Sequence, residues 1–160
     1  MASAYVAGLR LLARRELSET QVRERLARRE FTQPLIDEAI ERLRACGAVD
    51  DLRVATAVAR TEAHVRRRGR LRIRRKLAAI GIAADVAVRA LDEVFGGLDE
   101  PTLMAEALGR RLRGPRATIA DAAHFRRLHQ YLVRQGFQPE AVTRLLKRRA
   151  RLGAAPDDEA

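Results

Sequence analysis

The chain has 160 residues, of which 47% are hydrophobic and 33% charged, a composition typical of a globular protein with enough apolar side chains for a core. Lysine and arginine (32) outnumber aspartate and glutamate (21), so the formal net charge is +11 and attraction to polyanions is expected. Aromatic residues make up only 4% of the chain, and tryptophan is absent. Few side chains could therefore stack on nucleic-acid bases, so contacts with phosphates are expected instead.

The sequence excludes several classes of site and compartment. Cys46 is the only cysteine, which excludes an internal disulfide and a cysteine-based zinc site and suits a reducing compartment. No apolar stretch approaches the roughly 18 residues that span a bilayer, and the N-terminal region lacks a signal-peptide core. His124 and His129 lie about 140° apart around a helix, the wrong spacing for two metal ligands on one face. We therefore expect a cytoplasmic protein with no metal site, cofactor, catalytic residues or membrane contact.

Apolar positions recur at helical spacing, which predicts an all-α fold. A first helix is expected near residues 2–15. Ser18 and Gln21 have the spacing of a capping box and mark the start of a second helix. A third begins at Thr32 or Gln33, with Pro34 in its first turn, and Gly47 closes it.

The pattern of the second and third helices returns twice, which indicates internal repeats. The aligned core positions are Val22, Leu26, Phe31, Ile36, Ala39 and Ile40, then Ile73, Leu77, Ile82, Ala87, Ala90 and Leu91, then Leu128, Leu132, Phe137, Val142, Leu145 and Leu146. Gly81 and Gly136 occupy the turns of the later copies, where a left-handed backbone is easiest for glycine. The first copy has Glu30 there, so that turn is expected to be strained or differently closed.

Each copy is preceded by another helix, expected at residues 2–15, 51–67 and 101–113, with Asp50 or Asp51 as the N-cap of the second and Pro101 near the start of the third. The predicted domains are three-helix repeats at residues 1–49, 50–97 and 98–153, followed by a flexible tail at 154–160. Gly114 and Pro115 separate two helices of the last repeat. Units of roughly 45 residues have thin cores, so neighbours are expected to pack into an elongated, curved, monomeric array.

Several segments carry a family resemblance in order along the chain: LLARRELS at 11–18, VRERLARR at 22–29, GAVDDLRVA at 47–55, Gly69, IRRKL at 73–77, IGI at 80–82 and YLVRQGF at 131–137. Together they resemble the RecX family, regulators of the RecA recombinase. The chain departs from the family pattern at Val54 and Val58, where aromatics are usual, and at Glu30, where glycine is usual. These departures affect packing and a turn.

The resemblance implies a regulatory protein rather than an enzyme. It implies binding in the groove of the RecA–DNA filament and inhibition of ATP hydrolysis and strand exchange, in DNA repair, recombination and the SOS response. The implied partners are the RecA filament and single- or double-stranded DNA, held electrostatically and without sequence specificity. A basic helix-turn-helix transcription regulator is the alternative, although cations spread over all three repeats favour an extended surface over one recognition helix.

Residues 66–76 are the densest charged segment, with eight cations among eleven residues. At about 100° per residue they cannot share one helix face, so a helix junction is expected near Gly69. Like charges this close repel one another on a helix, a cost without structural benefit unless an anion neutralises them. The alternative is a solvated arginine-rich face. The predicted DNA or filament contacts are Arg66, Arg67, Arg68, Arg70, Arg72, Arg74, Arg75 and Lys76.

Milder basic clusters form a second set of candidate contacts. They are Arg14, Arg15, Arg28, Arg29, Lys147, Arg148 and Arg149. Glu16, Glu24 and Glu30 are close enough in sequence to pair with the first four, so a solvated face is favoured there. The last three have no acid nearby, but cations also suit a helix C-terminus, so both interpretations stay open.

Overall fold

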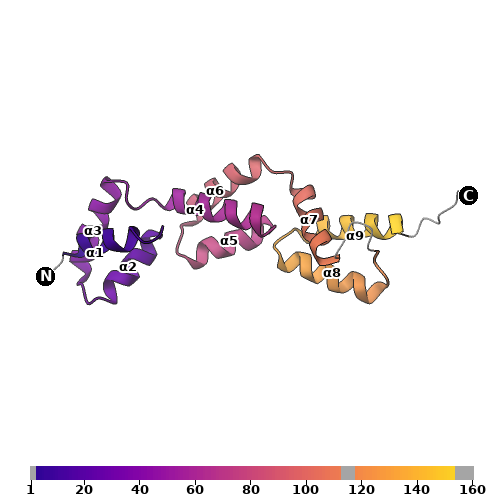
Figure 1. Ribbon diagram of the computed structural model, residues 1–160, viewed down its shortest axis with the longest axis horizontal. Helices are drawn as coiled ribbons and strands as arrows, with labels where there is room; N and C mark the ends of the chain where they lie inside the picture. The colour runs from indigo at the N-terminus through magenta and orange to yellow at the C-terminus, as the bar shows by residue number, and fades with distance from the viewer. Residues whose placement is uncertain (1–2, 113–117, 154–160) are drawn as a thin grey trace, which may run out of the picture. The chain divides into compact units, whose positions relative to one another are not determined.

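The computed structural model describes residues 3–112 and 118–153, so the expected break at Gly114 and Pro115 and the expected tail at 154–160 lie outside the described residues. The helices are α1 (Ala4–Leu12), α2 (Glu19–Ala27), α3 (Gln33–Ala45), α4 (Asp51–Arg60), the π-helical segment η1 (Thr61–Val65), α5 (Arg70–Ala79), α6 (Ala84–Gly96), α7 (Glu100–Leu112), α8 (Ala122–Arg134) and α9 (Pro139–Gly153) (Figure 1). The described residues contain no strand, which confirms the predicted all-α fold.

The chain divides into two compact units. Unit 1 comprises Met1–Ala59 and Arg74–Val94, and unit 2 comprises Arg60–Ile73 and Phe95–Ala160, so the division passes through α5. The repeat boundaries at 1–49, 50–97 and 98–153 stay a prediction.

The first three helices pack around an apolar core, and local capping sets their ends. Ser18 and Gln21 form the predicted capping box, and Pro34 lies in the first turn of α3. Gly47 follows α3 with φ +69°, as a C′ glycine does. The core residues are Ala4, Ala7, Leu17, Val22, Leu26, Ile36, Ala39, Ile40, Leu43 and Val49. Burial of each large apolar side chain contributes about 1.5–3 kcal/mol, which holds these short helices together.

Two neighbouring aspartates cap two different helices in unit 1. Asp50 accepts the backbone N–H of Arg53 (2.9 Å) and caps α4. Asp51, in the first turn of α4, accepts the backbone N–H of Glu19 (2.8 Å) and so caps α2. Partial burial raises the pKa of the Asp51 carboxyl, and the Glu19 N–H opposes that rise. Both acids therefore have structural roles, one of them between helices distant in sequence.

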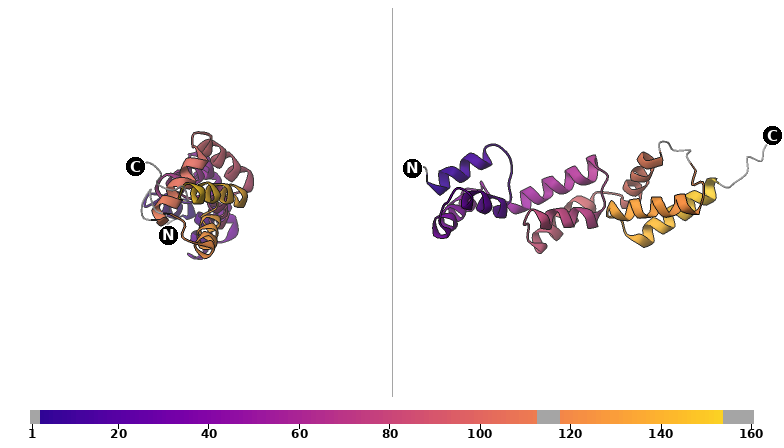
Figure 2. Two further views of the ribbon diagram at one scale, coloured as in Figure 1. Left: turned by 90° about the vertical axis from the view of Figure 1, so that its right-hand side faces the viewer. Right: turned by 90° about the horizontal axis from the view of Figure 1, so that it is seen from below.

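In unit 2, α8 and α9 lie side by side (Figures 1 and 2). The turn between them carries Phe137, which is fully buried. The helical stripes that pack here are Leu128 and Leu132 from α8, Val142, Leu145 and Leu146 from α9, and Leu103, Met104, Ala107 and Leu108 from α7. These include all six positions that the overlay assigned to the third copy.

In unit 1, the turn after α5 docks on the start of α2. The Ser18 hydroxyl donates to the carbonyl oxygen of Ile80, and the Thr20 hydroxyl donates to that of Gly81 (3.1 Å). A Cβ built on Gly81 would collide with the Thr20 side chain. Glycine is therefore required here for the close approach as well as for its φ of +80°.

In unit 2, the turn after α8 docks on the start of α5 in the same way. The backbone N–H of Gly69 donates to Gln135 (2.9 Å), and that of Leu71 donates to Gly136 (3.1 Å). The repeat overlay aligns Ser18 with Gly69 and Gly81 with Gly136, so the two junctions are equivalent. The turn of each later copy thus packs on the second helix of the copy before it, as expected of neighbouring repeats.

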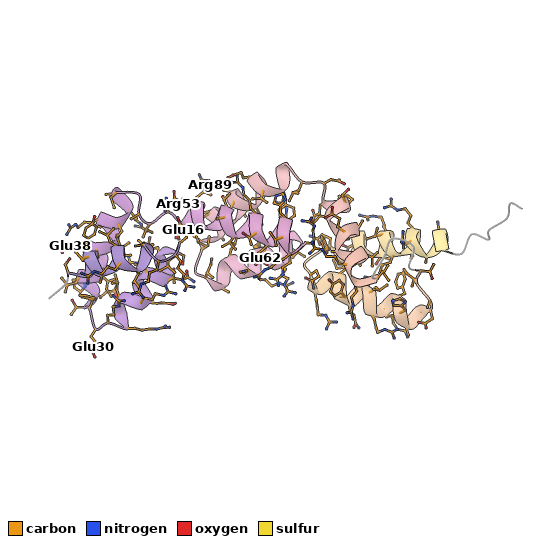
Figure 3. The ribbon with its side chains drawn as sticks, viewed as in Figure 1. Glu16, Glu30, Glu38, Arg53, Glu62 and Arg89 are labelled. Carbon is orange, nitrogen blue, oxygen red and sulfur yellow. The ribbon has the colours of Figure 1, made fainter. Side chains whose placement is uncertain are left out.

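Glu30 occupies the turn position of Gly81 and Gly136 in the first copy. Its φ is +65°, against +80° and +96° for the two glycines, so the turn closes in the same left-handed conformation. The side chain is exposed and points away from the helices (Figure 3). The turn is therefore strained rather than differently closed.

Replacing Glu30 with glycine should raise the free energy of unfolding by about 1 kcal/mol, because it removes the cost of a left-handed backbone at a residue with a Cβ. Urea unfolding followed by far-UV circular dichroism measures the change. Glu41→Gly in the exposed middle of α3 is the matched control and should lower stability by about 1 kcal/mol. Equal destabilisation by both variants would contradict the assignment of strain to Glu30.

Two predicted helix boundaries were wrong. The first helix ends at Leu12 rather than near residue 15. The helix expected at 51–67 is α4 followed by η1, in which the Arg66 N–H donates to the carbonyl of Thr61, five residues earlier. This wider turn ends the helix at Val65, and such segments occur often at functional sites.

Candidate nucleic-acid interface

The segment 66–76 spans the junction between η1 and α5, as its charge pattern predicted. The left-handed residue in this junction is Arg67 (φ +54°), not Gly69. Gly69 serves close approach instead, since a Cβ there would lie 2.5 Å from the carbonyl oxygen of Gly136. The cations on either side of Gly69 therefore lie on a segment whose backbone packs tightly against Gly136.

Glu62 lies in η1 with its side chain only 1% exposed, and it binds two of the predicted contact residues. Arg66 Nη1 lies 3.0 Å from Glu62 Oε1, and Arg68 Nη1 pairs with Oε2 of the same carboxylate. Glu62 is labelled in Figure 3. Glu62 was not among the predicted site residues, although its four-residue spacing to Arg66 is that of a helical ion pair.

Three further cations of the segment also have partners within unit 2. Arg67 forms an ion pair with Glu106 of α7. The Arg70 guanidinium lies 4.9 Å from the ring centre of Phe95, and Arg72 Nη1 donates to the carbonyl oxygen of Arg134 (3.0 Å). Anions within the protein therefore neutralise part of the charge of this segment, since Glu62 pairs with Arg66 and Arg68 and Glu106 pairs with Arg67.

Arg74 and Arg75 differ from the cations before them. Both lie on α5 with exposed side chains, and no hydrogen bond or ion pair joins either side chain to another described residue. Lys76 is half-buried and makes an interaction of its own. Within the predicted cluster, Arg74 and Arg75 are thus the cations most available to a partner.

The secondary cations Arg14, Arg15, Arg28 and Arg29 lie in the turns that follow α1 and α2, and all four are exposed. Glu16 pairs with Arg53 (3.1 Å; Figure 3) rather than with Arg14 or Arg15. Glu24 and Glu30 also form no ion pair with Arg28 or Arg29 in the part of the chain that the structure describes. The expected neutralisation of Arg14, Arg15, Arg28 and Arg29 by these acids was therefore wrong. In α9, Lys147 and Arg148 are exposed, whereas Arg149 is half-buried.

Among the described residues, no group of three or more histidine, cysteine or acidic side chains is placed to hold a metal ion. His129 Nε2 lies 3.1 Å from the Thr143 hydroxyl, so this histidine links α8 to α9 through a hydrogen bond. The described helices are all too short or too polar to cross a membrane.

The fold and the surface together define a helical-repeat protein whose candidate contact residues are cationic side chains. Residues 4–43 match the first three-helix domain of RecX, and residues 50–91 match the second. The chain belongs to the RecX family, which confirms the resemblance seen in the sequence. RecX is a family of regulatory proteins.

Relatives support the assignment along most of the chain. A regulatory protein RecX of Syntrophotalea carbinolica is 32% identical over 134 residues, which cover 84% of this chain and 88% of that protein. One of Geobacillus thermodenitrificans is 32% identical over 143 residues, but this chain spans only 52% of its length. The crystal structure of RecX from Lactobacillus salivarius has the same fold, with a TM-score of 0.73 at 20% identity over 93% of this chain and 95% of that one.

Proposed function

We propose that this protein binds the RecA–DNA filament and lowers RecA ATP hydrolysis and strand exchange in DNA repair, recombination and the SOS response. It acts without catalysis of its own, as a cytoplasmic monomer. Membership of the RecX family carries the proposal, since relatives matched over most of the chain are regulatory proteins RecX. RecA as the partner follows from the family resemblance.

The surface supports a polyanionic partner. The net charge is +11, and Arg74 and Arg75 expose two guanidinium groups that no described residue neutralises. Arginine in such a position binds phosphate through several N–H groups. We propose Arg74 and Arg75 as the principal contacts of the 66–76 segment. Arg66 and Arg68 can contribute only the donors that Glu62 leaves available.

Titrating the protein into a RecA ATPase assay on single-stranded DNA should lower the rate, with saturation at high protein concentration. The variant Arg74→Gln/Arg75→Gln should need a higher concentration for the same inhibition. Its apparent affinity should depend less on salt, by about 1.4 in the slope of log K against log salt, since each contact with single-stranded DNA contributes about 0.7.

Arg10→Gln/Arg89→Gln is the matched control, because it removes the same charge from exposed sites on α1 and α6 (Arg89 is labelled in Figure 3). It should inhibit as the parent does. An unchanged ATPase rate at saturating parent protein would refute the proposed function. Equal weakening by both pairs would leave only a general charge effect and refute the assignment of Arg74 and Arg75.

A further inference from the structure

A second basic feature lies on α9, away from the 66–76 segment in sequence. Arg144, Lys147, Arg148 and Arg151 line a groove of about 430 Å³, and no other described residue lines it. Their spacing, i, i+3, i+4 and i+7, places them along one helix face. Lys147 and Arg148 were among the predicted contacts and Arg144 was not, although this spacing could have revealed it.

These four cations have no internal partner among the described residues, since no hydrogen bond or ion pair is formed by any of their side chains. Like charges three and four residues apart destabilise a helix by about 0.2–0.5 kcal/mol per pair. The C-terminus of a helix favours cations, but that effect does not require four of them around one groove. By contrast, Glu62 and Glu106 neutralise Arg66, Arg67 and Arg68.

The position of the groove indicates which polyanion it fits. The apolar face of α9, with Val142, Leu145 and Leu146, is buried in the protein core. A helix that lies on a lipid surface needs an exposed apolar face beside its cations, which α9 lacks. From Arg144 to Arg151 the helix rises roughly 10 Å, at 1.5 Å per residue. That length spans about three phosphates of one DNA strand at 3.4 Å each.

We propose that the groove on α9 binds the phosphodiester backbone of nucleic acid. This binding does not depend on base sequence and does not require RecA. It deepens the proposed function, on which it rests for the identity of the polyanion. Arg144, Lys147, Arg148 and Arg151 supply the contacts. Arg149 lies outside the groove and is half-buried, so it is not one of them.

The test uses the full chain, naked DNA and no RecA. Fluorescence anisotropy of a labelled oligothymidylate measures affinity across a salt series for the parent and for Arg144→Gln/Lys147→Gln/Arg148→Gln. The variant should show a salt slope smaller by about 2, from roughly 0.7 per lost contact. Raising salt from about 50 to 200 mM should then weaken the parent roughly twenty-fold more than the variant. Far-UV circular dichroism should be unchanged, because the three side chains are exposed.

Arg10→Gln/Arg89→Gln/Arg127→Gln is the charge-matched control, with exposed residues on α1, α6 and α8. It should keep the salt slope of the parent. An equal fall in slope in both variants, or none in the groove variant, overturns the proposed site. So does a groove variant that loses binding to phosphatidylserine vesicles while its DNA affinity is that of the parent.

Failure here is distinguishable from failure of the proposed function. If the groove variant binds naked DNA as the parent does, while the parent inhibits RecA, only the α9 site is refuted. If the groove variant shows the expected loss while the parent leaves RecA ATPase unchanged, only the proposed function is refuted.

Discussion

Replacing Gly136 with alanine should lower the free energy of unfolding by about 3 kcal/mol or more. Its φ of +96° lies in the region that residues with a Cβ avoid, at a cost of about 1–2 kcal/mol. A Cβ there would also lie 2.5 Å from the Arg72 Cβ and 2.8 Å from the Gly69 carbonyl oxygen. Relief of that collision separates the turn from α5 and breaks the hydrogen bonds from Gly69 and Leu71, each contributing about 1 kcal/mol.

Three other glycines separate the two causes of this loss. Gly47 has φ +69° but open space around its Cβ position, so Gly47→Ala should show only the backbone cost. Gly69 has the collision without the left-handed backbone. Gly109 has neither, within α7, and alanine there should stabilise the helix by about 0.5–1 kcal/mol.

Urea unfolding of the four alanine variants tests this ordering. Gly136→Ala should cost the most, Gly69→Ala and Gly47→Ala less, and Gly109→Ala should be neutral or stabilising. A loss at Gly136 no larger than at Gly47 would show that the junction between the turn and α5 contributes nothing to stability.

The features that the sequence predicted correctly are mainly local ones. Ser18 and Gln21 form a capping box because both partners lie within one helical turn. Gly81 and Gly136 were identified as left-handed turn residues from their place in the repeat, and both have positive φ. The apolar stripes followed from helical periodicity, which depends only on neighbours in the same helix.

What the sequence did not reveal depends on contacts between distant residues. A helix junction was predicted near Gly69, but the close approach that requires glycine at this position comes from Gly136, 67 positions later. The pairing of Arg53 with Glu16 likewise joins α4 to the segment before α2. Cation counts located the charged segment correctly, but they could not show that Glu106 neutralises Arg67. Availability of a charge is a tertiary property, which is why the free cations had to be found in the structure.

Removing both arginines from Glu62 should be the second large effect on stability. Arg66→Met/Arg68→Met keeps much of the side-chain volume but takes away the two cations that pair with a carboxylate only 1% exposed. Desolvation of a charge that loses two of its partners is costly, and breaking a buried ion pair lowers stability by about 3–5 kcal/mol. We expect about 3 kcal/mol, because Arg66 is 51% exposed and solvent already screens its share of the interaction.

A third substitution identifies the cause. Adding Glu62→Gln to the double variant should recover part of the lost stability, since a buried neutral amide costs less than a buried carboxylate. In the parent, Glu62→Gln alone should destabilise, so the same substitution changes sign between the two backgrounds. Arg74→Met/Arg75→Met removes equal charge from exposed, unpaired positions and should change stability by no more than about 1 kcal/mol, or 0.5 per residue. If Glu62→Gln destabilises equally in both backgrounds, Arg66 and Arg68 do not stabilise the charge of Glu62, and the stability of this junction does not depend on the two ion pairs.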